Sequence, residues 1–285
     1  MTFIDAVFQY GFLQKALLTS TMVGIICGVI GCFIILRGMA LMGDAISHAV
    51  LPGVAISYML GINFFFGAVF SGVITAIAIG FVSQNSRIKH DTSIGIMFTA
   101  AFASGIIIIT MLKSSTDLYH ILFGNVLAVR SSDMWITLGI GIIVLGAVYL
   151  FYKELLVTSF DETMGAAYGL PVRVIHYFLM TLLTMVTVAS LQTVGIILVV
   201  AMLITPAAAA CLLTERLWVM IFLAAGIGVV SSVVGLYFSF TYNLASGATI
   251  VMAATAIFVL VFLFSPKHGL IWKILKVKKK RASLV

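Results

Sequence analysis

The sequence predicts an all-α membrane protein that crosses the bilayer several times, and three observations support that fold class. Of its 285 residues, 62% are hydrophobic and 9% are charged, whereas a soluble domain carries roughly 25% charged residues. Apolar runs of about 20 residues, the length that a helix needs to cross the hydrocarbon core, follow one another along the chain. Nearly all charges fall between these runs. Such a chain cannot bury its apolar surface in one globule, so lipid must be its solvent.

The apolar runs predict nine spans in one transmembrane domain that covers residues 1–285. In chain order the predicted spans are 17–36, 44–60, 64–83, 93–112, 134–152, 174–192, 195–213, 219–240 and 248–265. The second span is short, and the polar seam between the sixth and seventh is weak, so eight spans is the alternative count. The sequence contains no recognisable repeat or linker that would indicate a second domain.

Lysine and arginine are distributed unequally between the predicted loops. Three fall on one side of the membrane, Lys15, Lys113 and Arg130, and 13 on the other, Arg37, Arg87, Lys89, Lys153, Arg173, Arg216 and the seven from Lys267 onward. Because cytoplasmic loops carry the excess of basic residues, the C-terminus is expected inside and, with nine spans, the N-terminus outside. The basic tail 267–285 is expected at the anionic inner leaflet. This accounts for the net charge of +7 without nucleic-acid binding.

The stretch "LMGDAISHAVLPG", Leu41–Gly53, places two ionisable residues in an apolar region. Asp44 and His48 are four residues apart and share one helix face. Ionisable groups at membrane depth are costly and normally face the bundle interior or a water path. A carboxylate and a neutral imidazole suit a divalent cation such as Mn, Fe or Zn. We therefore predict a metal contact; the alternative is an Asp that caps the second span and a His bonded to a neighbouring helix.

Pro52 follows this pair and predicts a helix break. Proline has no N–H, so the carbonyl of His48 loses its helical partner. A freed carbonyl of this kind can face an ion or water, as in the broken helices of transporters. The expected orientation puts Asp44 near the cytoplasmic end, unless the residues before it dip into the membrane.

A second polar stretch, "KSSTDLYHILFGN", lies on the predicted outer side at Lys113–Asn125. Asp117 and His120 are three residues apart and can also share a helix face. The segment is too short and too polar to span. We predict a helix that dips into the outer vestibule and provides a second metal contact or an outer gate. An amphipathic surface helix is the alternative.

The longest predicted interior loop contains "SFDETMGAAYGLPV", Ser159–Val172. Asp161 and Glu162 are typical of the start of a short helix, and Gly169 with Pro171 is typical of its end. A short helix held beside the membrane by two spans is suited to docking a cytoplasmic protein. A plain solvated loop would have a similar composition.

A fourth stretch, "VGIILVVAMLITPAAAA", contains Pro206, which frees the carbonyl of Met202 within a span. The alanines that follow permit close helix approach. A packing kink without substrate contact is the favoured interpretation.

Several enzyme motifs do not occur in the sequence. It lacks G-x-x-x-x-G-K-[ST], so the chain cannot bind ATP through a P-loop, and it lacks H-E-x-x-H and G-x-S-x-G. We therefore expect neither an enzyme nor a permanently bound cofactor.

Four stretches together resemble a known family over roughly residues 10–266: "LRGMALMGDAISHAVLPGVAISY", "SSTDLYHILFGNVLAV", "SFDETMGAAYGLPV" and "VGIILVVAMLITPAAAA". They resemble the membrane (permease) subunit of bacterial ABC-type manganese, zinc and iron importers, above all the manganese importers of streptococci and their relatives. The resemblance implies the fold of the vitamin B12 and siderophore importer permeases, with one fewer N-terminal span.

The resemblance also implies partners and site residues. It implies a homodimer with the ion pathway at the subunit interface, two copies of a separate cytoplasmic ATPase, and an extracellular protein that delivers manganese, zinc or iron. It places the protein in the bacterial plasma membrane. The loop 159–172 matches the coupling-helix region, and Asp44 and His48 match metal-pathway positions. The alternative function is a proton-coupled secondary metal transporter, which would use Asp44 and His48 as proton sites and need no ATPase.

Overall fold

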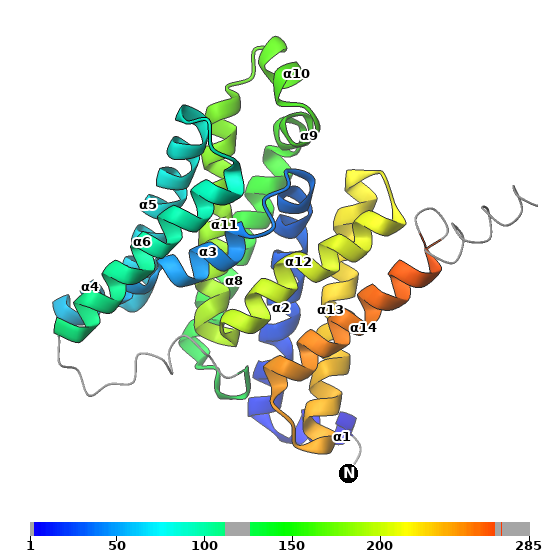
Figure 1. The fold of residues 1–285 in the computed structure, drawn as a ribbon. Helices are drawn as coiled ribbons and strands as arrows, with labels where there is room; N and C mark the ends of the chain where they lie inside the picture. The colour runs from blue at the N-terminus through cyan, green and yellow to red at the C-terminus, as the bar shows by residue number, and fades with distance from the viewer. Residues whose placement is uncertain (1–2, 112–125, 266–268, 270–285) are drawn as a thin grey trace, which may run out of the picture.

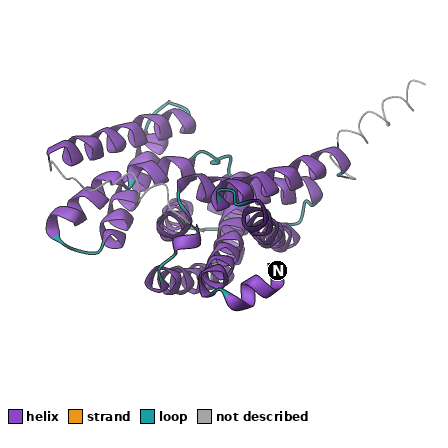
Figure 2. Cartoon of the chain, turned by 90° about the horizontal axis from the view of Figure 1, so that it is seen from below, coloured by secondary structure: helices purple, strands orange, loops and turns teal. Residues whose placement is uncertain are grey.

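The computed structural model describes residues 3–111, 126–265 and 269. Within these residues every regular element is a helix (Figure 2). Eight helices are long and apolar enough to cross a membrane, namely α2 (Gly11–Leu36), α5 (Phe64–Asn85), α6 (His90–Met111), α8 (Ser131–Leu150), α11 (Val172–Val194), α12 (Ile196–Leu213), α13 (Leu217–Tyr242) and α14 (Ser246–Phe264). They correspond to eight of the nine predicted spans, and the predicted all-α membrane fold is confirmed.

The remaining predicted span, 44–60, is helical but broken. It consists of α3 (Met42–Ala49) and α4 (Leu51–Leu60), which meet at Val50. Pro52 lies in the first turn of α4 and has no N–H for the carbonyl four residues earlier, which explains the position of the break. The hydroxyl of Ser71 in α5 donates to the neighbouring carbonyl of Ala49 at 2.7 Å, so α5 satisfies part of the exposed backbone. Neither half is long enough to span by itself.

Helices α2 and α11 form the centre of the bundle. In each of them 72% of the most apolar stretch is buried, compared with 11% in α6 and α14. Figure 1 shows α4, α5 and α6 on one side of this centre and α12, α13 and α14 on the other. Glycine allows α2 to cross α13 closely, because a β-carbon at Gly24 would lie 2.9 Å from the backbone of Gly228. The outer helices therefore keep their apolar faces for lipid or another protein.

The other short helices lie at the ends of the bundle. They are α1 (Phe3–Gln9), η1 (Val126–Ala128), α9 (Tyr152–Phe160) and α10 (Glu162–Ala167). Among them only the first residue of α9, Tyr152, falls within a predicted span. Figure 1 shows α1 and α10 at opposite ends. This arrangement agrees with the prediction that the N-terminus and the 159–172 loop lie on opposite sides of the membrane.

The turn after α2 explains how α3 reaches the middle of the bundle. Gly38 adopts a φ of 67°, a left-handed conformation that favours glycine. The N–H of Met39 donates to the carbonyl of Ile34 at 3.0 Å, and that of Gly38 donates to Ile35 at 3.1 Å, which is the Schellman arrangement of a helix end. The chain then turns back, and Figure 1 shows α3 roughly halfway between α10 and α1. This is the inward dip that a deep position of Asp44 requires.

Candidate functional site

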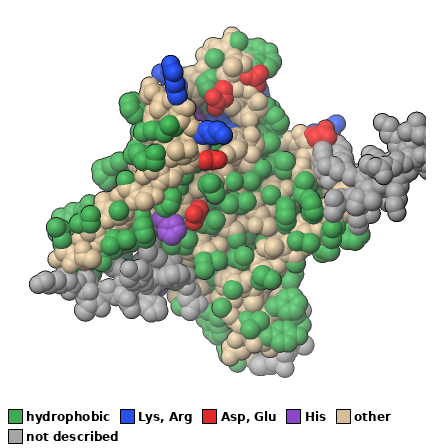
Figure 3. All heavy atoms as spheres, viewed as in Figure 1, with side chains coloured by type: hydrophobic (Ala, Val, Ile, Leu, Met, Phe, Trp, Pro, Cys, Tyr) green, Lys and Arg blue, Asp and Glu red, His purple; other side chains and the backbone are tan. Residues whose placement is uncertain are grey.

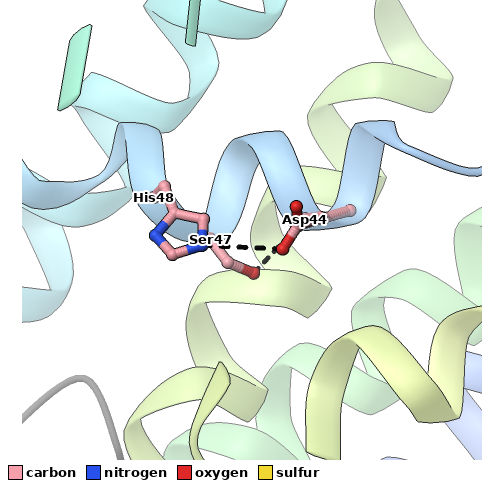
Figure 4. Close-up of polar contacts among 4 residues, drawn as sticks. Asp44, Ser47 and His48 are labelled. Carbon is pink, nitrogen blue, oxygen red and sulfur yellow. Dashed lines mark hydrogen bonds and ion pairs between the residues drawn. The ribbon is translucent and has the colours of Figure 1, made fainter. Parts of the chain in front are cut away.

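Helix α3 brings Asp44 and His48 together on one face, as their spacing predicts. The Oδ1 atom of Asp44 lies 3.6 Å from the Nε2 atom of His48, and the two side chains are 46% and 32% exposed (Figure 4). Metal–ligand bonds of about 2.1 Å allow two ligands of one ion to lie up to about 4 Å apart. Both atoms can therefore bind the same ion. Ser47 lies between them but donates its hydroxyl to the carbonyl of Gly43 at 2.8 Å, within its own helix.

The pair opens into a pocket of about 520 Å³. Apart from Asp44 and His48, its walls come from α12 and α14, through Ile196, Ile197, Val200, Ala201, Ile204, Thr205 and Val251. Asp44 and His48 are thus the two titratable side chains in a largely apolar pocket. Figure 3 shows a histidine and an acidic side chain side by side in the middle of this face, whereas the other charged side chains gather toward the α10 end.

Two aromatic residues of α6 pack against the His48 ring. The ring of Phe102 meets it edge-on at 5.5 Å and 81°, and the ring of Phe98 lies at 6.3 Å. The opposite face of α3 is fully buried at Ile46 and Ala49. The imidazole is therefore held between packed helices while its Nε2 atom points toward Asp44.

The pair is an incomplete metal site within one chain. Across residues 3–111 and 126–265, no group of three or more His, Cys, Asp and Glu side chains could hold an ion. A divalent transition metal takes four or more ligands. Further ligands must come from water, from backbone or from residues elsewhere. Asp117 and His120 lie outside the described residues, and their predicted metal contact stays a prediction.

The two proline positions have different surroundings. Pro52 has no N–H, so it cannot form the helical hydrogen bond to the carbonyl of His48. That this carbonyl faces an ion stays a prediction. Pro206 lies inside the continuous helix α12 and is buried. Its neighbour Thr205 lines the pocket. The packing interpretation of Pro206 therefore agrees with its burial, although it lies close to the site.

The predicted helix in the 159–172 loop is present as α10. The Asp161 carboxylate caps it by accepting from the N–H groups of Thr163 at 2.8 Å and Met164 at 3.1 Å, and from the Thr163 hydroxyl. These bonds, the hydroxyl first, lower the pKa of Asp161. Glu162 begins the helix. After α10, Gly169 adopts a φ of 78° and Pro171 precedes α11.

The α9–α10 segment and the residue that follows it expose three large apolar side chains. Phe160, Met164 and Tyr168 are 59%, 50% and 69% exposed. An apolar patch on a short protruding helix is typical of a contact with another protein. This supports the docking interpretation over a plain solvated loop.

Sequence reasoning missed the pocket walls and a polar cluster around Arg37. The wall residues are apolar residues in apolar spans, so no sequence signal separates them from lipid-facing ones. Arg37 was interpreted as a topology marker at the end of a span. The one signal that could have indicated a further role is its position just before the Asp44–His48 stretch.

Comparisons with known proteins agree with this fold. Residues 9–265 match the sequence profile of the ABC 3 transport family. The manganese transport system membrane protein MntC of Listeria innocua is 68% identical over 272 residues, which cover 95% of this chain and 97% of that protein. A solved structure, PsaBC from Streptococcus pneumoniae in complex with Fab, has a TM-score of 0.85 and 52% identity, with 97% of this chain and 98% of that one covered.

A more distant solved structure shows the same fold. It is described as a metal-chelate type ABC transporter in an inward-facing conformation, and it has a TM-score of 0.69 at 14% identity, with 90% of this chain and 87% of that one covered. The predicted fold class is thus confirmed by similarity to a solved structure as well as by the all-helical composition of the described residues. Since the family profile spans nearly the whole chain and the 68% identical relative is matched over almost its full length, the chain belongs to the ABC 3 transport family.

Proposed function

We propose that this chain is the permease subunit of an ATP-driven manganese importer in which Asp44 and His48 contact the ion in transit. The observation that carries the proposal is the separation of 3.6 Å between the carboxylate and the imidazole, on one helix face, in an apolar pocket at the middle of the bundle. Uncompensated ionisable groups at such depth are costly unless they serve an ion or proton path. Similarity to proteins named for manganese transport supports the cargo.

The donor atoms suit the proposed cargo. Carboxylate oxygen and imidazole nitrogen bind Mn²⁺, and no cysteine is among the residues that line the pocket. Zn²⁺ and Fe²⁺ accept the same donors, so the pair alone does not select manganese. We assign much of the selection to an extracellular binding protein that delivers the ion. The ion is cargo, and no permanently bound cofactor is part of the proposal.

A homodimer would complete the pathway. One chain supplies two ligands, and the walls of the pocket come from α12 and α14. Ile197 and Met252, on these two helices, are 62% and 68% exposed. A second copy against this face would shield the apolar residues and bring a second Asp–His pair toward the first. The large exposed area of α14 supports this arrangement.

The proposed location is the bacterial plasma membrane, with α10 and the C-terminal tail in the cytoplasm. Two copies of a separate ATPase would dock on the α10 region. Membership of the ABC 3 transport family supports an ATP-driven mechanism over the proton-coupled alternative. Transport would then require ATP hydrolysis rather than a proton gradient.

Uptake of radioactive manganese into proteoliposomes that contain the permease, its ATPase and the binding protein tests the site. Asp44→Ala and His48→Ala should each abolish uptake, while copurification of the ATPase persists. Ser47→Ala is the matched control, because Ser47 lies between the pair but bonds only within its own helix. It should transport normally. Near-normal uptake by either Asp44→Ala or His48→Ala would refute the proposed metal contact.

A further inference from the structure

A buried polar cluster joins the end of α2 to α9 and α11. The guanidinium of Arg37 donates from Nη2 to the Thr158 hydroxyl at 2.7 Å and from Nε to the Ser159 hydroxyl at 3.2 Å. Its Nη1 lies 3.4 Å from Nδ1 of His176 in α11. Arginine has no acceptor, so the His176 nitrogen must accept this bond. One side chain thus connects three helices.

The partners of Arg37 are held firmly in place. Thr158 and Ser159 are 1% and 7% exposed. The Thr158 hydroxyl donates its proton to the carbonyl of Glu154 at 2.8 Å, which directs its lone pairs toward the guanidinium. Burial lowers the pKa of Arg37, and the charge of Glu162 at the start of α10 opposes this shift. The guanidinium stays charged, and the acidic start of α10 stabilises it there.

Helix α10 packs directly on the residue that Arg37 contacts. A β-carbon at Gly165 of α10 would lie 3.2 Å from Cγ2 of Thr158 and 3.4 Å from Cγ2 of Val172. Gly165 therefore lets α10 approach α9 closely. Because the two helices are this close, a movement of α10 toward α9 would press on Thr158.

Arg37 is also close in sequence to the metal pair. It is the C-cap of α2, and residues 38–41 connect it to α3, which begins at Met42. The N–H of Met42 donates to the carbonyl of Met39 at 3.0 Å, so this connection is compact. The rest of α2 is held against α13 at Gly24 and Gly228. A displacement of Arg37 would therefore act on the turn at Gly38 and on α3.

We propose that Arg37 is a positioning residue that links the α9–α10 segment to α3, so that movement of α10 on the ATPase changes the position of Asp44 and His48. This inference rests on the proposed function, in which α10 contacts the ATPase. The path runs from Gly165 to Thr158, through the guanidinium to the turn at Gly38, and then to α3. Arg37 does not touch the ion; it acts through the segment that carries the ligands.

The test uses the complete transporter in proteoliposomes and measures manganese transported per ATP hydrolysed. Arg37→Ala should lower this ratio about tenfold, within the range of coupling between distant sites, while ATP hydrolysis and ATPase copurification stay near normal. Arg37→Lys should not restore it, because an ammonium group cannot reproduce the directed fork of donors. Arg87→Ala is the matched control, since Arg87 is an exposed arginine in the turn between α5 and α6.

A second variant keeps the proposal testable if Arg37→Ala assembles poorly. Thr158→Val removes the hydroxyl but keeps the size of the side chain, and it should lower the ratio in the same direction. Combined with Arg37→Ala it should add no further loss, because both changes cut one path. An unchanged ratio in Thr158→Val and Arg37→Ala, or a fall in the ratio only in step with lost assembly, would overturn the proposal.

Two cysteine reporters separate this inference from the proposed function. Of the three free cysteines, Cys27 and Cys32 are buried and Cys211 is partly exposed, so Cys211 is replaced by alanine in both reporters. Met164→Cys on α10 then reports ATPase docking, and Leu41→Cys at the start of α3 reports movement of the metal segment; both positions are exposed. Thiol labelling at 164 should be blocked by the ATPase. Labelling at 41 should change with nucleotide, and Arg37→Ala should abolish that change. No protection at 164 refutes the docking proposal, whereas protection at 164 with an unaltered response at 41 refutes the role of Arg37.

Discussion

Asp44 and Asp161 both stand at the start of a short helix, and their surroundings differ. Asp161 accepts three hydrogen bonds from Thr163 and Met164 and caps α10. Asp44 lies in the first turn of α3, but α3 has no side-chain cap, and its carboxylate points to His48 at 3.6 Å. The alternative in which Asp44 caps the second span is therefore wrong. A carboxylate whose bonds are satisfied locally builds the fold, and one that faces a pocket is available to a ligand.

Position in the bundle adds to this contrast. Asp161 is at the end of the molecule, where water solvates it. Asp44 belongs to α3, which Figure 1 shows about halfway along the bundle, where an ionised carboxylate without a partner costs several kcal/mol. The same residue type thus has an architectural role at one site and a proposed transport role at the other.

The largest effect is expected when the same chemical change is made at both aspartates. Asp44→Asn keeps the size and an oxygen but removes the charge. Manganese uptake should fall at least about 100-fold, because loss of a ligand should cost at least as much as loss of a residue that supports one, which is about 10–100-fold. Asp161→Asn keeps a good capping acceptor, so uptake should stay near normal. Uptake in proteoliposomes, with equal amounts of assembled transporter, measures both. Equal losses in the two variants would remove the distinction between the two carboxylates.

An intermediate effect is expected at Gly169, which ends the α10 region. Its φ of 78° is costly for a residue with a β-carbon, by about 1–2 kcal/mol. Gly169→Val should shift α10 and lower transport per ATP without unfolding the spans. Gly95→Val on α6 is a control, because a β-carbon there meets open space and no positive φ is involved. Normal coupling in Gly169→Val would show that the position of α10 does not matter for transport.

The positions of the spans and the identity of the polar site residues could be predicted from the sequence, whereas the three-dimensional arrangement of the site could not. Apolar runs set the span positions, because lipid permits few alternatives to a helix. The break at Val50 followed from Pro52, and the short helix α10 from Asp161 and Gly169. The depth of Asp44 did not follow, because it depends on how the turn at Gly38 directs the chain. The pocket walls and the Arg37 cluster did not follow either, because they depend on packing between segments far apart in sequence.

The smallest effect on manganese uptake is expected from changes in the basic tail 267–285, which carries many positive charges. Residues 276–285 contain five of the seven basic residues that follow Pro266. Each contributes about 1 kcal/mol of attraction to an anionic membrane surface, and this attraction depends on number rather than on position. The spans already anchor the chain, so removing residues 276–285 should leave manganese uptake largely intact.

Replacing the same basic residues by glutamine should give the same result, because it removes the charge but keeps the length. Complete loss of uptake in a stable, inserted truncation, but not in the glutamine variant, would mean that the tail acts through specific contacts, as Asp44 is proposed to do, and not through charge alone.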